Sequence, residues 1–324
     1  MFQIHGVDNR GHVVLKKQPR RKQMLVFFDQ LNPCLVGIEA CGSSHYWSRE
    51  LQKRGHQVRL IAPQHVKPYV KGNKNDANDA AAICEAVSRP GMNFVATKTI
   101  KQQDMQATDR IHSELVKQRT AKSNQIRGLL AEYGIVVARQ IGKLRRAIPE
   151  ILEDAENGLT SQLRRLLSGL QADLIQLGNR AKEIKVQIQR QGSENEAAQR
   201  LQQIPGIGPI TATALICTIG NGTQFQRGRD MAASIGLVPR QHSSGGKNRL
   251  LGISKRGNAH LRTLLIHGAR AVLQATKHKD DPRSRWLKTL SERRNKNIAA
   301  VALANKNARI AWALLTNKQD YQPA

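Results

Sequence analysis

The chain has 324 residues, with 52 Lys and Arg against 24 Asp and Glu, and a formal net charge of +28 at pH 7. Because so large a charge repels itself in a compact protein, it indicates a polyanionic partner, nucleic acid first and an anionic membrane surface second. No apolar run reaches the roughly 18 residues of a membrane span, and no basic and apolar leader opens the chain. A cytoplasmic protein of about two domains is therefore expected.

The cysteine and aromatic contents exclude two further classes of protein. The four cysteines, Cys34, Cys41, Cys84 and Cys217, show no zinc-ligand spacing, so reduced thiols are expected. Aromatic residues make up only 4% of the chain, too few for an aromatic platform of the kind that stacks single-stranded bases.

Residues 1–98 are predicted to form an α/β domain. Two short apolar runs, 35–38 and 58–62, are typical of buried strands, and the stretch between them, 44–54, has a helical pattern. A strand, a helix and a strand in this order predict a parallel pair with a crossover. A further helix is expected from Asp76 to Val87.

The region 99–197 is predicted to be helical and to contain a coiled coil. After one helix at about 101–133, apolar residues recur at spacings that alternate between four and three, the signature of a heptad seam. These residues are Leu163, Leu167, Leu170, Leu174, Leu177, Ala181, Ile184 and Ile188. Breaks at Gly134 and Pro149 allow the two helices to fold back on each other; alternatively, the seam pairs two subunits.

The region 198–290 is predicted to be a second, mainly helical domain, and 291–324 a final helix and tail. The turn Ile204–Pro209 precedes an apolar helix, and a Gly-rich polar loop follows at 243–247. A basic helix is expected next, with Lys255, Arg256, His260 and Arg262.

Three carboxylates are candidates for a metal site. Glu39 follows the apolar run 35–38, while Asp76 and Asp79, three apart, share one face of the predicted helix. A strand-end carboxylate that faces a helical pair can hold Mg²⁺, which prefers oxygen ligands and polarises phosphodiesters. The alternative is that Asp76 is the N-cap of the helix and Asp79 a partner of its dipole.

One turn is a candidate for contact with a phosphate. Gly206 and Gly208 lie in an apolar-Pro-Gly-Ile-Gly turn similar to the hairpin of helix-hairpin-helix modules, whose backbone N–H groups bind a DNA phosphate. The alternative is an ordinary turn between helices.

The Gly-rich loop offers a candidate nucleophile. A serine there can approach a phosphate closely, and neighbouring cations can stabilise the charge that develops. The serines are Ser243 and Ser244, and the cations that would contact nucleic acid are Arg240, Lys247, Arg249, Lys255 and Arg256. The alternative is a solvated loop in which the neighbouring His242 has no role.

Four segments, taken together and in this order, resemble the DEDD-type insertion-sequence transposases, the group founded on insertion sequence one-hundred-ten. They are Val36–Gly42, Asn73–Ala80, Ile204–Gly208, and Gly236–Arg240 with Ser243–Gly246. The combination is specific, and it spans nearly the whole chain.

The resemblance implies a fold that is α/β plus all-α: an RNase H-like domain of the RuvC type, a central coiled coil and a C-terminal transposase domain. Glu39, Asp76 and Asp79 match family acids that bind Mg²⁺. Ser244, with Ser243 as the close alternative, matches a serine that attacks DNA and forms a phosphoserine link. The implied partners are the DNA of element ends and target, a structured guide RNA from the element and further copies of the chain, and the implied location is the bacterial nucleoid.

One departure from the family pattern concerns the first acid, which in the family lies on a first strand upstream of Phe2. The chain begins at Met1, where that strand should already have ended. Asp8 falls in a predicted turn and does not replace the missing acid. The resemblance therefore implies an N-terminally truncated domain without its first strand and one metal ligand, in which Mg²⁺ binding and recombination are expected to be weak.

Three functions are compatible with these patterns: a recombinase that acts by metal-assisted serine attack, a junction-resolving metal nuclease without a covalent intermediate, and a non-enzymatic nucleic-acid binder. A covalent protein–DNA adduct distinguishes the first, and cleavage distinguishes the second from the third. A steep fall of affinity with salt is expected for all three.

Overall fold

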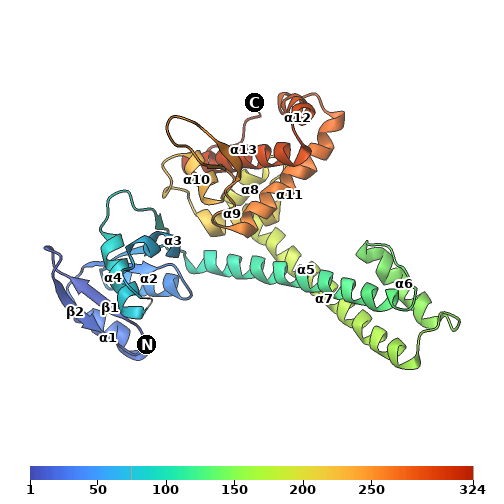
Figure 1. Ribbon diagram of the computed structural model, residues 1–324, viewed down its shortest axis with the longest axis horizontal. Coiled ribbons are helices and arrows are strands. Elements are labelled where there is room, and N and C mark those ends of the chain that lie inside the picture. The colour runs from blue at the N-terminus through green and yellow to red at the C-terminus, as the bar shows by residue number, and fades with distance from the viewer. Residues whose placement is uncertain (74, 324) are drawn as a thin grey trace. The chain divides into compact units, whose positions relative to one another are not determined.

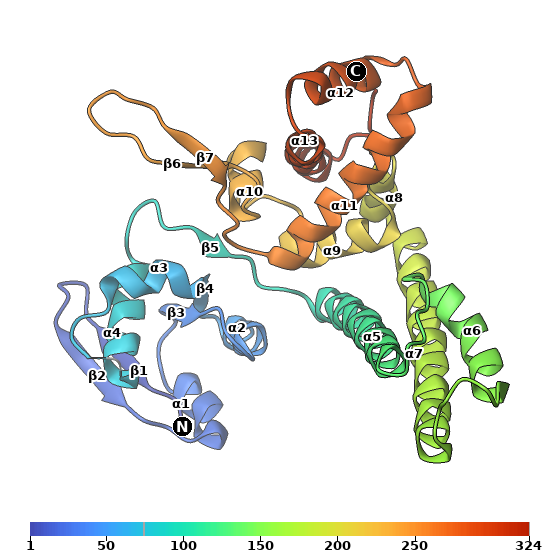
Figure 2. The same ribbon diagram turned by 45° about the vertical axis from the view of Figure 1, so that its right-hand side comes forward.

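The computed structural model describes residues 1–73 and 75–323, so Lys74 of the predicted acidic motif lies outside the described residues. The chain divides into two compact units. The first comprises Met1–Ile100 with Gly222–Gln226, and the second comprises Lys101–Asn221 with Arg227–Ala324. Figures 1 and 2 show the elements of each unit.

The first unit is α/β, as predicted. Its strands are β1 (Ile4–Val7), β2 (Val13–Lys17), β3 (Leu35–Glu39), β4 (Gln57–Ile61) and β5 (Phe94–Val95). Its α-helices are α1 (Met24–Asp29), α2 (Ser44–Gln52), α3 (Pro63–Val66) and α4 (Asp76–Val87), with short 3-10 turns at Arg21–Gln23 and Lys67–Tyr69.

These strands form two separate sheets. β1 and β2 make an antiparallel hairpin, while β3 pairs in parallel with β4, which pairs antiparallel with β5. The predicted crossover is confirmed, because α2 connects β3 to β4 and Val36 lies opposite Val58. Among the described residues β1 bonds only to β2, and β3 only to β4, so each has one edge without a strand partner.

Helices cover both faces of the β3–β4 pair. On one face, α1 and α2 contribute Met24, Phe28, Trp47 and Leu51 to a cluster that also packs against β1. On the other face, α4 lies so close to β3 that a Cβ atom added to Gly37 would be 2.9 Å from the Cβ atom of Val87. Because Gly37 has no side chain, α4 can approach β3 this closely.

The second unit is mainly helical. Its helices are α5 (Ile100–Ala131), α6 (Ile141–Glu153), α7 (Ser161–Ser193), α8 (Glu196–Gln202), α9 (Pro209–Ile219), α10 (Gly228–Ser234), α11 (Ala259–Ala275), α12 (Pro282–Arg293) and α13 (Lys296–Asn317). Its strands are β6 (Pro239–Gln241) and β7 (Leu250–Ile253), and a 3-10 turn spans Thr276–His278.

The long helices α5 and α7 run antiparallel within the chain. Gln191 of α7 donates a hydrogen bond to Thr108 of α5 at 3.3 Å, and further along the pair Lys122 of α5 lies 3.1 Å from Asp173 of α7. The heptad residues of α7 alternate in burial. Leu163, Leu167, Leu174, Ala181 and Ile188 are buried, and the residues between them, Leu170, Leu177 and Ile184, are half-buried. The helices of one chain thus fold back on each other, which is one of the two arrangements that the seam allowed; pairing of two subunits stays a prediction.

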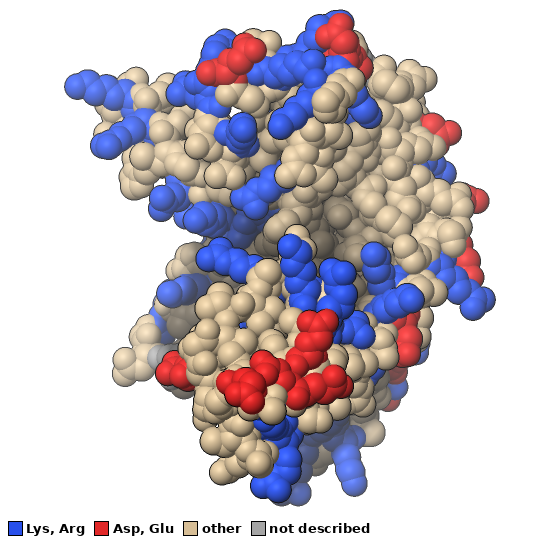
Figure 3. Space-filling view, turned by 90° about the vertical axis from the view of Figure 1, so that its right-hand side faces the viewer, with Lys and Arg blue, Asp and Glu red and all other residues tan. Residues whose placement is uncertain are grey.

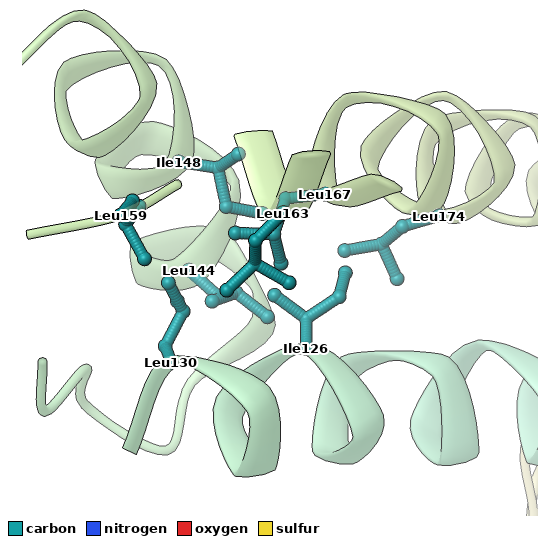
Figure 4. Packing of buried hydrophobic residues seen from close by; sticks show 8 residues of the cluster. All are labelled: Ile126, Leu130, Leu144, Ile148, Leu159, Leu163, Leu167 and Leu174. Carbon is teal, nitrogen blue, oxygen red and sulfur yellow. The ribbon is translucent and has the colours of Figure 1, made fainter. Parts of the chain in front are cut away.

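At the far end of this helix pair, α6 closes a hydrophobic cluster. Leu144 and Ile148 of α6 meet Ile126 and Leu130 of α5, and Leu163 of α7 packs on the same cluster (Figure 4). The proline predicted to break this region, Pro149, lies inside α6 instead. The apolar face of α6 is buried here, and that tertiary packing outweighs the backbone hydrogen bond that a proline removes.

The remaining helices of the second unit pack through small side chains. One face of α13 is buried, and α13 contacts α10 and α11. The buried residues on that face include Ala299, Ala300, Leu303, Ala304, Ala308 and Ala311. Such a face lets neighbouring helices approach closely. No helix among the described residues is both long and apolar enough to cross a membrane.

Candidate functional site

The three candidate carboxylates lie at the end of a strand and in the first turn of a helix, as predicted. Glu39 is the last residue of β3 and is half-buried. Asp76 and Asp79 occupy the first turn of α4, where Asp76 is exposed and Asp79 half-buried. The side chain of Asn75 caps the helix by accepting a hydrogen bond from Asn78 N at 2.7 Å. The alternative that Asp76 is the N-cap is therefore wrong, and its carboxylate is not used in capping.

The donor chemistry suits a divalent cation, because all three side chains offer carboxylate oxygens. However, no group of three or more His, Cys, Asp or Glu side chains among residues 1–73 and 75–323 comes together as a cation site. The structure brings Asp76 and Asp79 into one helical turn and does not bring Glu39 to them as a third ligand.

The Pro-Gly-Ile-Gly turn is fixed by contacts within the second unit. Gly206 has φ +93°, and a Cβ atom there would lie 3.0 Å from the carbonyl oxygen of Gly268 in α11. Asn307 of α13 donates a side-chain hydrogen bond to Pro205 O at 2.9 Å. Gly206 is thus needed for helix packing, whereas Gly208, the N-cap residue of α9, is exposed with open space around it. Phosphate contact at this turn stays a prediction.

The sequence indicated an irregular loop around the candidate serines. The structure instead has these serines at the tip of a β-hairpin. Lys247 N donates to Ser244 O at 3.0 Å across Gly245 and Gly246, whose φ angles are +54° and +75°. Two consecutive residues with positive φ define a two-residue turn of type I′, the connection that suits the twist of a hairpin. Residues 239–250 of this hairpin are all exposed.

The register of the hairpin assigns the two serines to opposite faces. Gln241 is paired with Leu250, and Ser244 with Lys247. Because side chains alternate along a strand, Ser244 shares its face with four basic or titratable residues. These are Arg240, His242, Lys247 and Arg249. We call this the basic face of the hairpin.

The opposite face, which we call the amide face, carries Gln241, Ser243 and Asn248 together with the exposed Leu250. The amide nitrogen of Gln241 lies 2.8 Å from Ser243 Oγ and 3.3 Å from Asn248 Oδ1 and donates to both. Ser243 is therefore engaged by a neutral partner, and Ser244 alone of the two serines has cationic neighbours.

The base of the hairpin is held by close backbone contacts. Gly257 has φ +70°, and a Cβ atom there would lie 1.7 Å from the carbonyl oxygen of Ser234. Arg262 donates to Ile235 O at 2.8 Å and to Arg256 O at 2.9 Å. These contacts fix the strands where they leave the helices, while the tip stays exposed.

Lys255 and Arg256, predicted to lie on a basic helix, precede it. Lys255 has φ +55°, which no helix interior tolerates, and α11 begins at Ala259 after the N-cap Asn258. The sequence signal that could have found this boundary is Gly257-Asn258, a chain reversal followed by a capping residue.

An ion pair between a buried carboxylate and a half-buried histidine was not predicted from the sequence. Asp109 of α5 has a side chain only 6% exposed, and its Oδ2 lies 2.8 Å from Nε2 of His260 in the first turn of α11. The interaction with Asp109 raises the pKa of His260, against the effect of burial. The only signal in the sequence is weak: Asp109 follows Met105 by four residues, and both are buried on the mainly apolar face of α5.

Positive charge is spread widely over the surface. Lys and Arg side chains are dispersed over the whole face drawn in Figure 3, among uncharged residues, and Asp and Glu form a few small groups. A protein of net charge +28 attracts polyanions over its whole surface, so the hairpin is one basic element among several.

Known protein families match both parts of the chain that hold these candidates. A DEDD transposase model of the IS110 type, described as "Transposase", matches residues 2–135. A second model, described as "Transposase IS116/IS110/IS902 family", matches residues 198–284.

Full-length relatives agree with these matches. A probable family 20 transposase of Pseudomonas aeruginosa is 52% identical over 100% of this chain and 96% of its own length. The transposase for insertion sequence element IS1111A of Coxiella burnetii is 49% identical, over 99% of this chain and 88% of that protein. The transposase for insertion sequence element IS1328 of Yersinia enterocolitica is 42% identical, over 97% and 93% respectively.

An α/β unit of the DEDD type combined with a mainly helical transposase region defines an insertion-sequence transposase. The chain belongs to the IS110/IS116/IS902 family of these transposases, which confirms the family predicted from its motifs. DNA is accordingly its partner.

Proposed function

We propose that the chain cuts and rejoins DNA through Ser244, whose hydroxyl oxygen attacks a phosphodiester. The observation that carries the proposal is the position of Ser244 at an exposed hairpin tip, on the same face as Arg240, Lys247 and Arg249. Those cations can attract the phosphate and stabilise the additional charge of the transition state. Ser243 is the weaker candidate because its hydroxyl accepts from Gln241 on the opposite face.

The attack by Ser244 needs no oxidant, reductant or other reagent besides water. Ser244 Oγ forms a bond to phosphorus, and the bond from phosphorus to one deoxyribose oxygen breaks. The serine proton passes to water, and the leaving oxygen takes a proton from water. The product is a phosphoserine ester, and attack on it by a hydroxyl of another DNA end rejoins a strand and frees the serine.

DEDD-type transposase domains generally use divalent metal ions, and we propose Mg²⁺ for this chain, with Asp76 and Asp79 as carboxylate ligands from one helical turn and Glu39 as a third that would have to move toward them. When bound, the ion would neutralise charge on the phosphate oxygens. What supports this is the position of the acids at a strand end and in the first turn of a helix.

The test is a search for a covalent adduct. The full chain is incubated with nicked DNA of its element ends in Mg²⁺ or Mn²⁺, and the products are separated under denaturing conditions before and after protease. We expect an adduct that disappears in Ser244→Ala and remains in Ser243→Ala, the matched control one residue away. Normal cleavage by Ser244→Ala would instead indicate a metal nuclease. DNA binding without cleavage by the unaltered chain in either metal would indicate a non-enzymatic binder.

We also propose that the chain works as an oligomer with a structured guide RNA of its element, on the nucleoid. The oligomer would form through the α5–α7 pair, where Leu170, Leu177 and Ile184 of the heptad seam are only half-buried and Leu166 is 57% exposed. Mass measurement in solution tests this. Leu177→Asp should lower the mass to that of one chain, whereas Val186→Asp, also on α7, should leave the mass unchanged.

A further inference from the structure

The hairpin formed by β6 and β7 is a two-stranded ribbon whose outer part, residues 239–250, is exposed on both faces. Every residue from 239 to 250 is exposed, and in Figure 2 the ribbon extends away from α10 and α11. An isolated ribbon of two strands is only marginally stable in water, so its ordered shape is best explained by a partner that covers it in use.

The charge around the ribbon identifies that partner as nucleic acid. Residues 231–279 contain no Asp or Glu at all. The same stretch contains Arg240, Lys247, Arg249, Lys255, Arg256, Arg262, Arg270, Lys277 and Lys279. A surface of one sign over so many residues suits a polyanion and repels basic proteins.

The two faces of the ribbon differ in chemistry. The basic face, with Ser244, suits phosphates, which accept hydrogen bonds and carry charge. The amide face carries no charge. Beside the exposed apolar Leu250, which is paired with Gln241, it holds three polar side chains, and the bonds from Gln241 to Ser243 and Asn248 hold these three in one array. Uncharged amides are the side chains that pair with base edges, in particular Gln or Asn with N6 and N7 of adenine.

We propose that the ribbon enters the major groove of a DNA duplex and that Gln241 and Asn248 of its amide face contact base edges there. The major groove of B-DNA admits a two-stranded ribbon of this kind. The long cationic side chains of the basic face, on the other side of the ribbon, then reach the phosphates that flank the groove, and Ser244 attacks one of these phosphates. In that last respect the inference rests on the proposed function, and it adds a direct sequence preference made by the protein.

The experiment measures sequence preference and salt dependence separately. The full chain, freed of nucleic acid and kept without divalent metal so that no strand is cut, selects from a DNA duplex pool with a randomised segment. The unaltered chain should enrich adenine at one or two positions. In Gln241→Ala/Asn248→Ala, the ratio of affinities for enriched and average duplexes should fall by about 5- to 100-fold, the value of one good bidentate contact.

The matched control is a pair of changes on the opposite face. Lys247→Gln/Arg249→Gln should weaken binding to all duplexes alike and reduce the slope of log affinity against log salt by about 1.8, since each lost phosphate contact contributes about 0.9. The amide pair should leave that slope unchanged. These opposite outcomes separate base contacts from phosphate contacts.

Loss of the amides could weaken binding simply by loosening the ribbon, and a third variant separates this effect from the loss of a base contact. Gln241→Glu should shift the enriched base from adenine towards cytosine, whose N4 amino group donates to a carboxylate; a structural role alone would not change the base. The proposal is overturned if the unaltered chain shows no preference, if the amide variants weaken all duplexes equally, or if the same preference appears with a single-stranded pool. The adduct of Ser244 is scored independently, so failure here leaves the proposed function standing.

Discussion

His260 Nε2 lies 2.8 Å from Asp109 Oδ2 and joins the first turn of α11 to the N-terminal third of α5. Both a side-chain hydrogen bond with Asp109 and the charge of its carboxylate raise the pKa of His260, against the effect of burial. The other oxygen of the carboxylate, Asp109 Oδ1, is buried without a partner among the described residues. A buried carboxylate in this position depends on the charge of its one histidine.

This ion pair predicts a pH dependence of stability. The Asp109 interaction raises the pKa of His260 above its ordinary value of 6.5. A pKa raised on folding adds stability that is complete below the unfolded pKa and is lost as pH rises through the folded pKa. The free energy of unfolding should therefore fall from about pH 6 upwards relative to His260→Gln, whose own curve should lack this component.

Chemical unfolding at several pH values measures this difference. Other charged or titratable groups lie near this pair. Arg110 acts on His260, and Arg119 and Lys185 act on the neighbouring His112, so all four residues stay unchanged in the unaltered chain and in His260→Gln. Parallel pH profiles of the two proteins would contradict the prediction. Burial lowers the pKa of His112 even though Asp109 acts to raise it, so His112 is not expected to replace His260.

Gly268→Ala should destabilise the second unit strongly. A Cβ atom at Gly268 would lie 1.8 Å from the carbonyl oxygen of Gly206, so α11 would have to move off the turn. Overpacking of this kind costs about 1–3 kcal/mol or more. The matched control is Gly128→Ala in α5, also a helical glycine but with open space, which should stabilise the helix by about 0.5–1 kcal/mol. Equal unfolding midpoints for the two variants would show that the turn is not held against α11.

Leu174→Ala should cost about 2–5 kcal/mol, because Leu174 is fully buried between the long helices and its loss leaves a cavity. Leu166→Ala on the same helix should be close to neutral for the folding of a single chain, since Leu166 is 57% exposed. Urea unfolding of both variants at low protein concentration measures this contrast. Similar losses would mean that the exposed side of α7 is also packed.

Asp76→Asn and Asp79→Asn should each weaken the binding of Mn²⁺, used as a spectroscopic probe for the proposed Mg²⁺ site, without unfolding the first unit. The Mn²⁺ affinity should fall at least about 10-fold, which is the loss caused by removing a residue that only hydrogen-bonds to a metal ligand. Glu132→Gln, an exposed acid just beyond α5, serves as the control and should leave the affinity unchanged. Equal Mn²⁺ affinity in all these proteins would remove the carboxylates from the proposed site.

The sequence predicted the elements whose pattern is local. The apolar runs of β3 and β4 and the helix from Asp76 to Val87 appear with nearly the expected bounds. Burial alternates along the heptad seam of α7. In each case the side chains that face the core are fixed by the period of the element itself.

The sequence did not predict features that depend on contacts between distant residues. The hairpin of β6 and β7 has few β-branched residues and is recognised by its register and its Gly245-Gly246 turn, while composition alone indicated a loop. The pairing of Asp109 with His260 joins positions far apart in the sequence. Convergence of Glu39 with the acids of α4, inferred from the resemblance, is not found among the described residues.

The tight turn at the tip of the hairpin has a consequence for how this protein can vary. With only two residues in the turn, the pairing of Ser244 with Lys247 fixes which serine points to which side. Inserting or deleting a single residue in β6 would turn every following side chain over. Ser244 would keep Lys247 opposite it across the turn but would point to the other side of the ribbon, so the direction in which the reacting serine faces depends on strand length as much as on the serine itself.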